Sequence, residues 1–459
     1  MQCRRLEHYD KGRFVEIFWE AGRVEVTSGS FGSKGRTREE AFSSVRECDE
    51  FVETTVARRL REGYVEVVPE VLRAREVRHV APEADWIARI AAAYDDDAPR
   101  LVYADHLEAL GDPLGELIAV QCQLARLDPW DPRCGVLRER EDTLMMTYRP
   151  RWLPKIEPDI KCTFHRGFVE RIAPEPSVRA PAFEQLMKHA PLVRTFEREM
   201  RFDYWQGRSP WANVPRALLE QLTGMAIHNW GQAAPGLREI LESPELARVN
   251  RLALTSCNLT PQHIDMIATR AWRELAFVGC SIGDDTAAKL LRASASILEE
   301  LVLDAGSVRD DTMHAIAGAP ASRLRRLAVR HTKATRAGMR ALAGSPHLPA
   351  LAALDVSDNA DVVGLFEDAQ LPALTELRLH QTGLDDDGLT ALLASPLATR
   401  LRVLDLSNNR LTDARLLLEA ELPELRVLDV SKNPLGARVR ELKSGLPRVR
   451  VNARGSQTS

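Results

Sequence analysis

The sequence lacks the features of a membrane or secreted protein. No stretch approaches about 18 uninterrupted apolar residues, so we expect no membrane-spanning helix. The start, MQCRRLEHYDKGRF, has no apolar core, so we expect no secretory signal. The seven cysteines are scattered and contain no C-x-x-C pair, which argues against a disulfide framework and against a zinc site. We therefore expect a cytoplasmic protein that binds no metal and no membrane.

A strong charge of one sign and the common catalytic motifs are also missing. The 459 residues carry 62 Lys and Arg against 66 Asp and Glu, a net charge of −4, so no whole-chain field attracts nucleic acid. We find no Walker loop, nucleophile elbow, H-E-x-x-H motif or kinase signature. The sequence thus predicts a protein that is not an enzyme and that uses no cofactor or small-molecule substrate. An enzyme that uses none of these motifs is the third and weakest hypothesis.

The C-terminal half repeats one short apolar pattern. Eight segments begin with leucine, carry a second apolar residue two positions later, and follow one another at intervals of 23 to 27 residues. They start at Leu252, Leu275, Leu301, Leu327, Leu354, Leu377, Leu404 and Leu428. A weaker copy starts at Met225, and VRVN from Val449 looks like a last half-repeat.

The spacing within each copy predicts a short strand followed by a tight turn. Two apolar residues separated by one lie on the same face of a strand. Five positions after the first leucine, a small polar residue is expected to be buried and to bond the backbone of the adjacent coil. This position holds Asn359, Asn409, Asn433, Cys257, Cys280, Thr332 and Thr382, and Gly306 leaves a gap. For the two cysteines this predicts a structural role, with reactivity as the alternative.

The pattern L-x-L-x-x-N/C-x-L resembles the leucine-rich repeat. The segments 260–271 and 385–396 read as helices between strands, begun by Thr and Asp caps. The resemblance implies an α/β solenoid with a parallel sheet on its concave face. Such a face is broad and has no deep pocket, so a macromolecular partner is the natural ligand.

Alternation within the strands identifies the side chains expected on the concave face. We predict that they bind a protein partner: Arg251, Thr255, Asp304, Arg326, Arg330, His331, Asp355, Arg378, His380, Asp405, Asp429 and Lys432. Arg326, Arg330, His331 and Arg378 form a basic group, and Asp355, Asp405 and Asp429 form an acidic row. A mixed face suits protein better than nucleic acid. The alternatives are simple solvation and, for the aspartates, turn chemistry.

The middle of the chain predicts short helices around a small core. In residues 83–165 apolar residues recur at helical spacing, with a break at Gly111-Asp112-Pro113. DAPRLVYAD from Asp97 and GDPLGELI from Gly111 resemble the repeat-companion domain of planctomycete and myxobacterial proteins, and FHRGFVERI (164–172) resembles the segment that often follows. The resemblance implies a bacterial source and carries no chemistry. His106 departs from the family's usual Trp.

This middle segment also holds an acidic cluster. It consists of Asp95, Asp96, Asp97, Asp105, Asp112 and Glu116. Because the EF-hand spacing is absent, we interpret Asp96 and Asp97 as helix caps and Asp112 as a turn residue. Catalysis or metal binding is the alternative.

The first 68 residues predict a small sheet with one long helix. FVEIFWEAGRVEV alternates as two strands joined at Ala21-Gly22, and Val45, Cys48, Phe51, Val52, Val56 and Leu60 share one helical face before Gly63. Together with FGSKGR and LREGYVE, these segments resemble the WGR domain, best known from DNA-dependent poly(ADP-ribose) polymerases. In that family the Trp and Arg of a Trp-Gly-Arg loop contact the DNA end.

Here the corresponding positions read Ser28-Gly29-Ser30. Serine offers neither a stacking ring nor a guanidinium, and residues 1–66 hold twelve Lys and Arg against thirteen Asp and Glu. We interpret Ser28 to Gly35 as a loop whose glycines serve the turn. Weak nucleic-acid binding by Ser28, Ser30, Lys34, Arg36 and Arg38 is the alternative.

The predicted fold is a multidomain α/β protein. The segments are a WGR-like α+β domain (1–68), a linker (69–82), a helical repeat-companion domain (83–165), an N-terminal cap of degenerate repeats (166–224), leucine-rich repeats (225–452) and a disordered tail (453–459). The predicted function is a scaffold or adaptor for a protein partner, with a DNA-associated regulator as the alternative.

Overall fold

The chain forms two compact units in the computed structural model. The described residues are 2–8, 11–20, 22–30, 35–67, 82–127, 131, 133–153, 159–199, 211, 213–228, 241–304, 306–367 and 369–453. One unit comprises Met1–Lys155 with His165–Phe168, and the other comprises Ile156–Phe164 with Val169–Ser459. Most of the predicted linker and tail lie outside the described residues.

The chain begins with a five-stranded sheet in the order β4-β3-β2-β1-β5. Its strands are β1 (Gln2–His8), β2 (Arg13–Glu20), β3 (Arg23–Ser30), β4 (Arg36–Ala41) and β5 (Val65–Val67). All of its strand pairs are antiparallel. Gly22, at φ +89°, turns β2 into β3, and any Cβ there would lie 2.9 Å from the Phe42 carbonyl oxygen.

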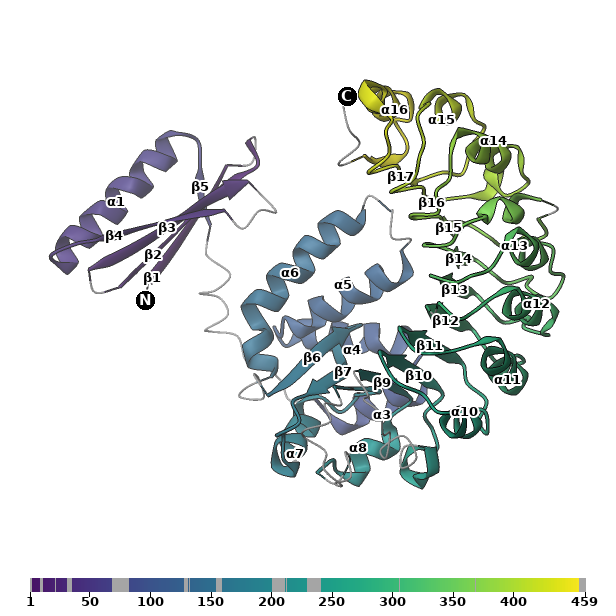
Figure 1. The fold of residues 1–459 in the computed structure, drawn as a ribbon. Helices are drawn as coiled ribbons and strands as arrows, with labels where there is room; N and C mark the ends of the chain where they lie inside the picture. The colour runs from purple at the N-terminus through teal and green to yellow at the C-terminus, as the bar shows by residue number, and fades with distance from the viewer. Residues whose placement is uncertain are drawn as a thin grey trace. The chain divides into compact units, whose positions relative to one another are not determined.

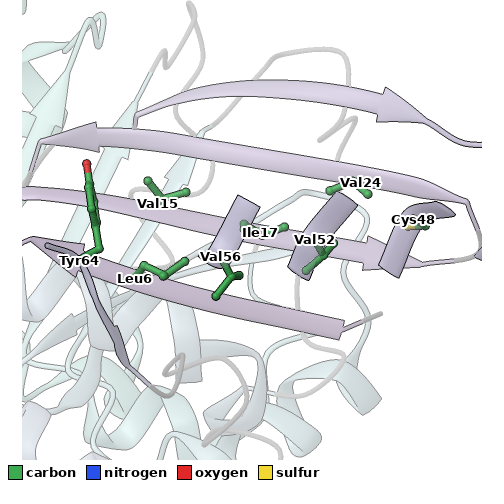
Figure 2. Close-up of a cluster of buried hydrophobic side chains, with 8 residues drawn as sticks. All are labelled: Leu6, Val15, Ile17, Val24, Cys48, Val52, Val56 and Tyr64. Carbon is green, nitrogen blue, oxygen red and sulfur yellow. The ribbon is translucent and has the colours of Figure 1, made fainter. Parts of the chain in front are cut away.

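Helix α1 (Val45–Arg61) supplies the other half of this core. Figure 2 shows the buried cluster, which joins Leu6, Val15, Ile17, Val24, Cys48, Val52, Val56 and Tyr64. Phe51 is partly buried and packs against this cluster, but two residues of the predicted apolar face lie outside it, because Val45 is 59% and Leu60 is 44% exposed. They stand in the first and last turns of the helix, so only its middle turns are buried against the sheet.

Four helices follow among the described residues. They are α3 (Ala84–Ala92), α4 (Ala98–Ala109), α5 (Leu114–Arg126) and α6 (Arg133–Trp152). The predicted break at 111–113 is confirmed: Gly111 has φ +76°, and the Leu114 amide donates to Asp112 Oδ1 at 2.9 Å. Asp112 thus serves a turn, as predicted. Asp96, predicted to be a helix cap, accepts from the first amide of α4, that of Ala98, at 2.9 Å.

Asp97 departs from its predicted role as a helix cap. It occupies the N-cap position of α4, but its side chain makes no capping bond. Its carboxylate instead accepts from Arg126 Nε at 2.8 Å and from Arg166 Nη1 at 3.3 Å. Burial alone would raise the pKa of this carboxyl, but the two guanidiniums outweigh it and hold the pKa below its ordinary value.

The Arg166-Gly167 turn packs onto α5 as well. The Gly167 amide donates to Gln121 Oε1 at 2.6 Å. Gly167 has φ +86°, and a Cβ there would lie 2.1 Å from Ile118 Cγ1, so only glycine fits. The FHRGF turn therefore meets the segments at Asp97 and Gly111 that precede it by some 50 to 70 residues.

The second sheet contains thirteen strands among the described residues, in reverse chain order from β18 to β6. They are β6 (Ile160–His165), β7 (Phe168–Pro174), β8 (Thr195–Glu199), β9 (Gly224–His228), β10 (Arg251–Thr255), β11 (Glu274–Val278), β12 (Glu300–Asp304), β13 (Arg326–Arg330), β14 (Ala353–Asp355), β15 (Glu376–Arg378), β16 (Val403–Asp405), β17 (Val427–Asp429) and β18 (Arg450–Asn452). Pairing is parallel from β7 to β18.

Helices connect most of these strands. They are α7 (Ala180–His189), α8 (Arg216–Gln221), α10 (Pro261–Ile267), α11 (Asp284–Ser294), α12 (Asp310–Gly318), α13 (Arg336–Ala343), α14 (Asp386–Ala394), α15 (Arg415–Glu419), α16 (Val439–Gly445) and the 3₁₀ turns η3 (Pro244–Leu246), η4 (Val362–Phe366), η5 (Ala398–Arg400) and η6 (Gly436–Arg438). In Figure 1 the strands line the inner side of the curve and α10 to α15 line its outer side. The predicted helices at 260–271 and 385–396 are confirmed, in shorter form.

The predicted buried position after each strand is confirmed at its three asparagines. Asn409 Nδ2 donates to the Leu379 carbonyl at 2.7 Å, and its Oδ1 accepts from the amides of Thr382 and Leu384, both at 3.0 Å. Asn359 and Asn433 also bond carbonyl oxygens of the preceding coil. The side chain thus ties two neighbouring coils together at a place where water is excluded. The residues at this position in successive repeats are called the ladder.

Candidate functional site

The sheet has one face that is not covered by its own helices. In β10, Leu252 and Leu254 are buried, whereas Arg251, Ala253 and Thr255 point the opposite way and are half-buried. The concave face is defined here by the first, third and fifth residues of each strand from β8 to β18. The parallel register aligns these residues in rows, so that Arg251, Glu274 and Glu300 are neighbours.

The structure places the predicted binding residues in two groups along this face. Arg251, Thr255, Asp304, Arg326, Arg330, Asp355, Arg378, Asp405 and Asp429 lie at first, third or fifth strand positions, and His331, His380 and Lys432 lie in the turns that follow. Whether they contact a partner stays a prediction.

The basic group on this face is largely paired with acidic neighbours. Arg326 Nε donates to Glu300 at 2.8 Å, and Arg378 Nε donates to Glu376 at 2.7 Å. Arg330 lies 3.5 Å from Asp304 and 3.9 Å from Asp355. These partners neutralise much of the positive field that a phosphate backbone would need.

The acidic row serves the turns as well as the face. Oδ1 of Asp355, Asp405 and Asp429 accepts from the amides of Ser357, Ser407 and Ser431 at 2.9 to 3.0 Å. The hydroxyls of Ser357 and Ser407 donate to the same oxygens at 2.6 Å. The turn chemistry considered for these aspartates is therefore present.

Backbone geometry explains two further predicted residues. His331 has φ +53° and Lys432 has φ +57°. Each directly precedes a small polar residue of the ladder, Thr332 or Asn433, and both side chains are exposed. These positions are set by the turn, since the left-handed region is uncommon for residues with a Cβ.

Sequence reasoning missed the first row of glutamates, namely Glu274, Glu300 and Glu376. Each directly precedes the leucine that opens its repeat, so it points to the same face as the residue between the leucines. The alternation that identified Arg251 and Arg326 could have found them. Glu300 accepts from Arg326 of the same row, and Glu376 accepts from Arg378 of its own strand.

The candidate nucleic-acid residues lie on β3 and β4. Contrary to the predicted loop, Ser28, Gly29 and Ser30 belong to β3 and pair with β2. The strand extends this far because Phe14 and Val15 opposite them continue β2. Arg36 and Arg38 are exposed on β4, and Arg38 pairs with Glu40 at 3.0 Å. Lys34 lies outside the described residues. Gly35, at φ +69°, is the glycine that a turn requires here.

The two ladder cysteines are buried free thiols. Cys257 Sγ donates to the Thr255 carbonyl at 3.3 Å, and Cys280 Sγ donates to the Leu254 carbonyl at 3.3 Å. The Cys257 thiol also lowers the pKa of Cys280 to about 7. Because both are at most 4% exposed, these contacts support the structural role.

Among the described residues, no group of three or more His, Cys, Asp and Glu is arranged to hold a metal ion. Within the same residues, no helix has the length and apolar character needed to cross a bilayer.

Comparison with known proteins supports the repeat assignment for one segment. Residues 399–443 match the family model described as leucine-rich repeats (2 copies). No curated protein matches the chain.

The solved structures that align with this chain include two of low sequence identity. A protein from Bacteroides fragilis is 16% identical, with 100% of this chain and 98% of that chain covered, at a TM-score of 0.34. A chain from the crystal structure of the Rad7 and Elc1 complex in yeast is 14% identical, with 91% and 99% covered, at a TM-score of 0.38. At such scores neither likeness supports a functional inference.

Proposed function

We propose that this protein is a non-enzymatic adaptor that binds a protein partner on the concave face of its repeats. Leucine-rich repeats suggest protein–protein interaction. The register of the parallel strands supports the concave face as the place where the partner binds. It aligns polar side chains of both signs in rows over β9 to β17 on the face that the outer helices leave open. Mixed, mutually paired charges fit a protein surface better than a polyanion.

The remaining segments enter this proposal as accessory docking domains. A WGR-like domain at 1–68 is supported by the five-stranded sheet and its single helix. A repeat-companion domain at 83–165 is supported by two bonds of the segment 164–172. Arg166 bonds Asp97, which opens the first matched segment, and Gly167 bonds Gln121 of α5, the helix that holds most of the second.

A charge-removing double variant on the concave face tests the proposal. Arg378→Ala removes an exposed cation, and Asp405→Asn removes a charge while keeping an oxygen that can accept from Ser407. The control, Arg292→Ala with Asp387→Asn, makes the same changes at exposed positions of α11 and α14.

The measurement is quantitative capture of partner proteins by the full chain in extract from the cells that naturally produce it. We expect capture to fall about tenfold for the concave variant, since removing interface charges costs on the order of 1–2 kcal/mol, and to stay unchanged for the control. Equal capture by both variants would count against the concave face.

A further inference from the structure

The concave face is hollowed where β7 to β12 run side by side. A cavity of about 200 Å³ lies over these strands, with Arg171, Arg251, Glu274 and Glu300 among its lining residues. The neighbouring row consists of Ala226, Ala253 and Ala276, and Gly224 opens β9. The short side chains leave room beside the longer charged ones, which is the physical origin of the hollow.

Glu274 stands in this hollow without a partner among the described residues, although both flanking pairs are complete. On one side Arg251 Nη2 donates to Thr223 Oγ1 at 2.6 Å. On the other side Arg326 Nε donates to Glu300 at 2.8 Å. In the part of the chain that the structure describes, the Glu274 carboxylate accepts no hydrogen bond and has no cationic side chain within 4 Å.

We propose that this hollow receives a lysine or arginine side chain from an extended segment of the partner protein, and that Glu274 binds its charged end. The inference rests on the proposed function, since the segment belongs to the partner of the concave face. It names the chemistry of one contact within that face.

The charge of Glu274 favours a cationic ligand. Burial raises the pKa of its carboxyl, an effect that Glu300 reinforces and that Arg251, Arg326 and Arg273 oppose. A partly desolvated carboxylate with no donor is unfavourable in the free protein. A lysine or arginine donates to it in a charge-assisted hydrogen bond and removes that penalty.

The size and surroundings of the hollow favour a side chain over a free small molecule. Pockets for small molecules usually measure about 300–1,000 Å³, whereas this one holds about 200 Å³. Parallel strands on either side continue the face, so a segment lying across them can place one side chain into the hollow. The two cations that line the hollow are held by other residues, Arg251 by Thr223 and Arg171 by Glu197.

Selection of peptides by the full chain tests the inference. The probe is a displayed library of nine-residue peptides with all amino acids at every position, selected on immobilised wild-type protein. Selected peptides are then measured by fluorescence anisotropy against Glu274→Gln and against Glu376→Gln. The second variant is a matched control, because Glu376 stands in the same row, four strands away, and is paired with Arg378. Circular dichroism verifies that both variants fold.

We expect the selected peptides to share Lys or Arg at one position and to bind Glu274→Gln about tenfold more weakly than wild type or Glu376→Gln. We also expect Glu274→Lys to select Asp or Glu at that position. A library without enrichment, selected peptides without a fixed basic position, or equal affinity for Glu274→Gln would each overturn the inference.

The two proposals fail separately. If Arg378→Ala with Asp405→Asn loses the cellular partner while the library yields no basic position, the inference is wrong and the proposed function stands. If that double variant keeps the partner while the peptides behave as expected, the hollow binds cations and the wider face is not the partner's site.

Discussion

The turns contain two kinds of structural residue, and only one of the two roles could be predicted from the sequence. Asn, Cys and Thr recur at the buried ladder position, so their role could be predicted from residue type. The residue before each has a positive φ: Ser256, Gly279, His331, Asp358, Gln381, Asn408 and Lys432. Six residue types besides glycine occur there, so no pattern of type predicts this geometry. It follows from the need to close the turn.

The ladder asparagine is the residue whose loss should cost most. Asn409→Ala removes the donor to the Leu379 and Leu406 carbonyls and the acceptor for the Thr382 and Leu384 amides. Because these groups are buried, we expect the free energy of unfolding to fall by about 2–3 kcal/mol. Urea denaturation followed by circular dichroism measures the change.

Asn408→Gly is the matched control for this variant. Asn408 has φ +57°, which suits glycine, and its side-chain amide donates to Gln381 Oε1 at 2.6 Å. Its backbone amide donates to the Ser431 carbonyl, a bond that glycine keeps. We expect a change within about 0.5 kcal/mol. Equal losses at both positions would contradict the role given to the ladder.

Elements are held to their neighbours by a second ladder at the helix starts. Sequence reasoning predicted caps within each helix, and Thr260 and Asp385 do cap α10 and α14. Asp284, Asp310 and Asp386 instead accept amide hydrogens from the next coil, at Arg309, Thr335 and Thr412. The partners lie 25 to 26 residues away, so local spacing could not reveal these bonds.

This helix-start ladder should give the repeats an acid-sensitive contact. Burial would raise the pKa of Asp310, but the bonds from Thr335 outweigh it and hold the pKa below its ordinary value. A lowered folded-state pKa means that the contribution is present above the unfolded-state pKa and is lost as pH falls through the folded-state pKa.

We therefore expect Asp310→Ala to lower the free energy of unfolding by about 1 kcal/mol at neutral pH, and the difference from wild type to shrink below about pH 4. Thermal unfolding across a pH series measures it, with Asp387→Ala at an exposed position of α14 as control. A difference that is constant from neutral to acid pH would contradict the assignment.

The β3–β4 hairpin bears on the prediction about DNA binding. Its exposed cations Arg36 and Arg38 are followed by Glu39 and Glu40, and Arg38 pairs with Glu40. Of these two cations, Arg36 alone has no carboxylate partner among the described residues, so the hairpin can release few counterions from DNA. We expect the full chain to show no salt-sensitive binding to a nicked 5′-phosphorylated duplex at low salt, measured by fluorescence anisotropy.

The variant Arg36→Glu provides the control for that measurement. If the wild-type chain binds with strong salt dependence and Arg36→Glu abolishes it, the DNA-associated alternative would replace the adaptor reading of this domain. Binding that is equal in both variants would arise elsewhere in the chain.

The whole molecule combines a well-predicted repeat region with segments that sequence alone describes less fully. The parallel solenoid follows from the leucine spacing, and it extends to β18 as the half-repeat at Val449 indicated. At the other end the sheet continues through β8, β7 and β6. The sequences of β7 and β8, such as TFERE in β8, keep the alternation of a strand but lack the leucines, so they read only as degenerate repeats. Strand β6 falls in the segment 83–165, which the sequence predicts to be helical.

Site-specific photo-crosslinking tests the adaptor account most directly. A photoreactive amino acid replaces Thr255 or Arg378 on the concave face, and Gln262 or Arg292 on the helix side, in the full chain within its native cells. The account predicts that crosslinks to one protein partner form from the two concave positions and not from the helix side. Crosslinks only from the helix side, or equally from both sides, would contradict it.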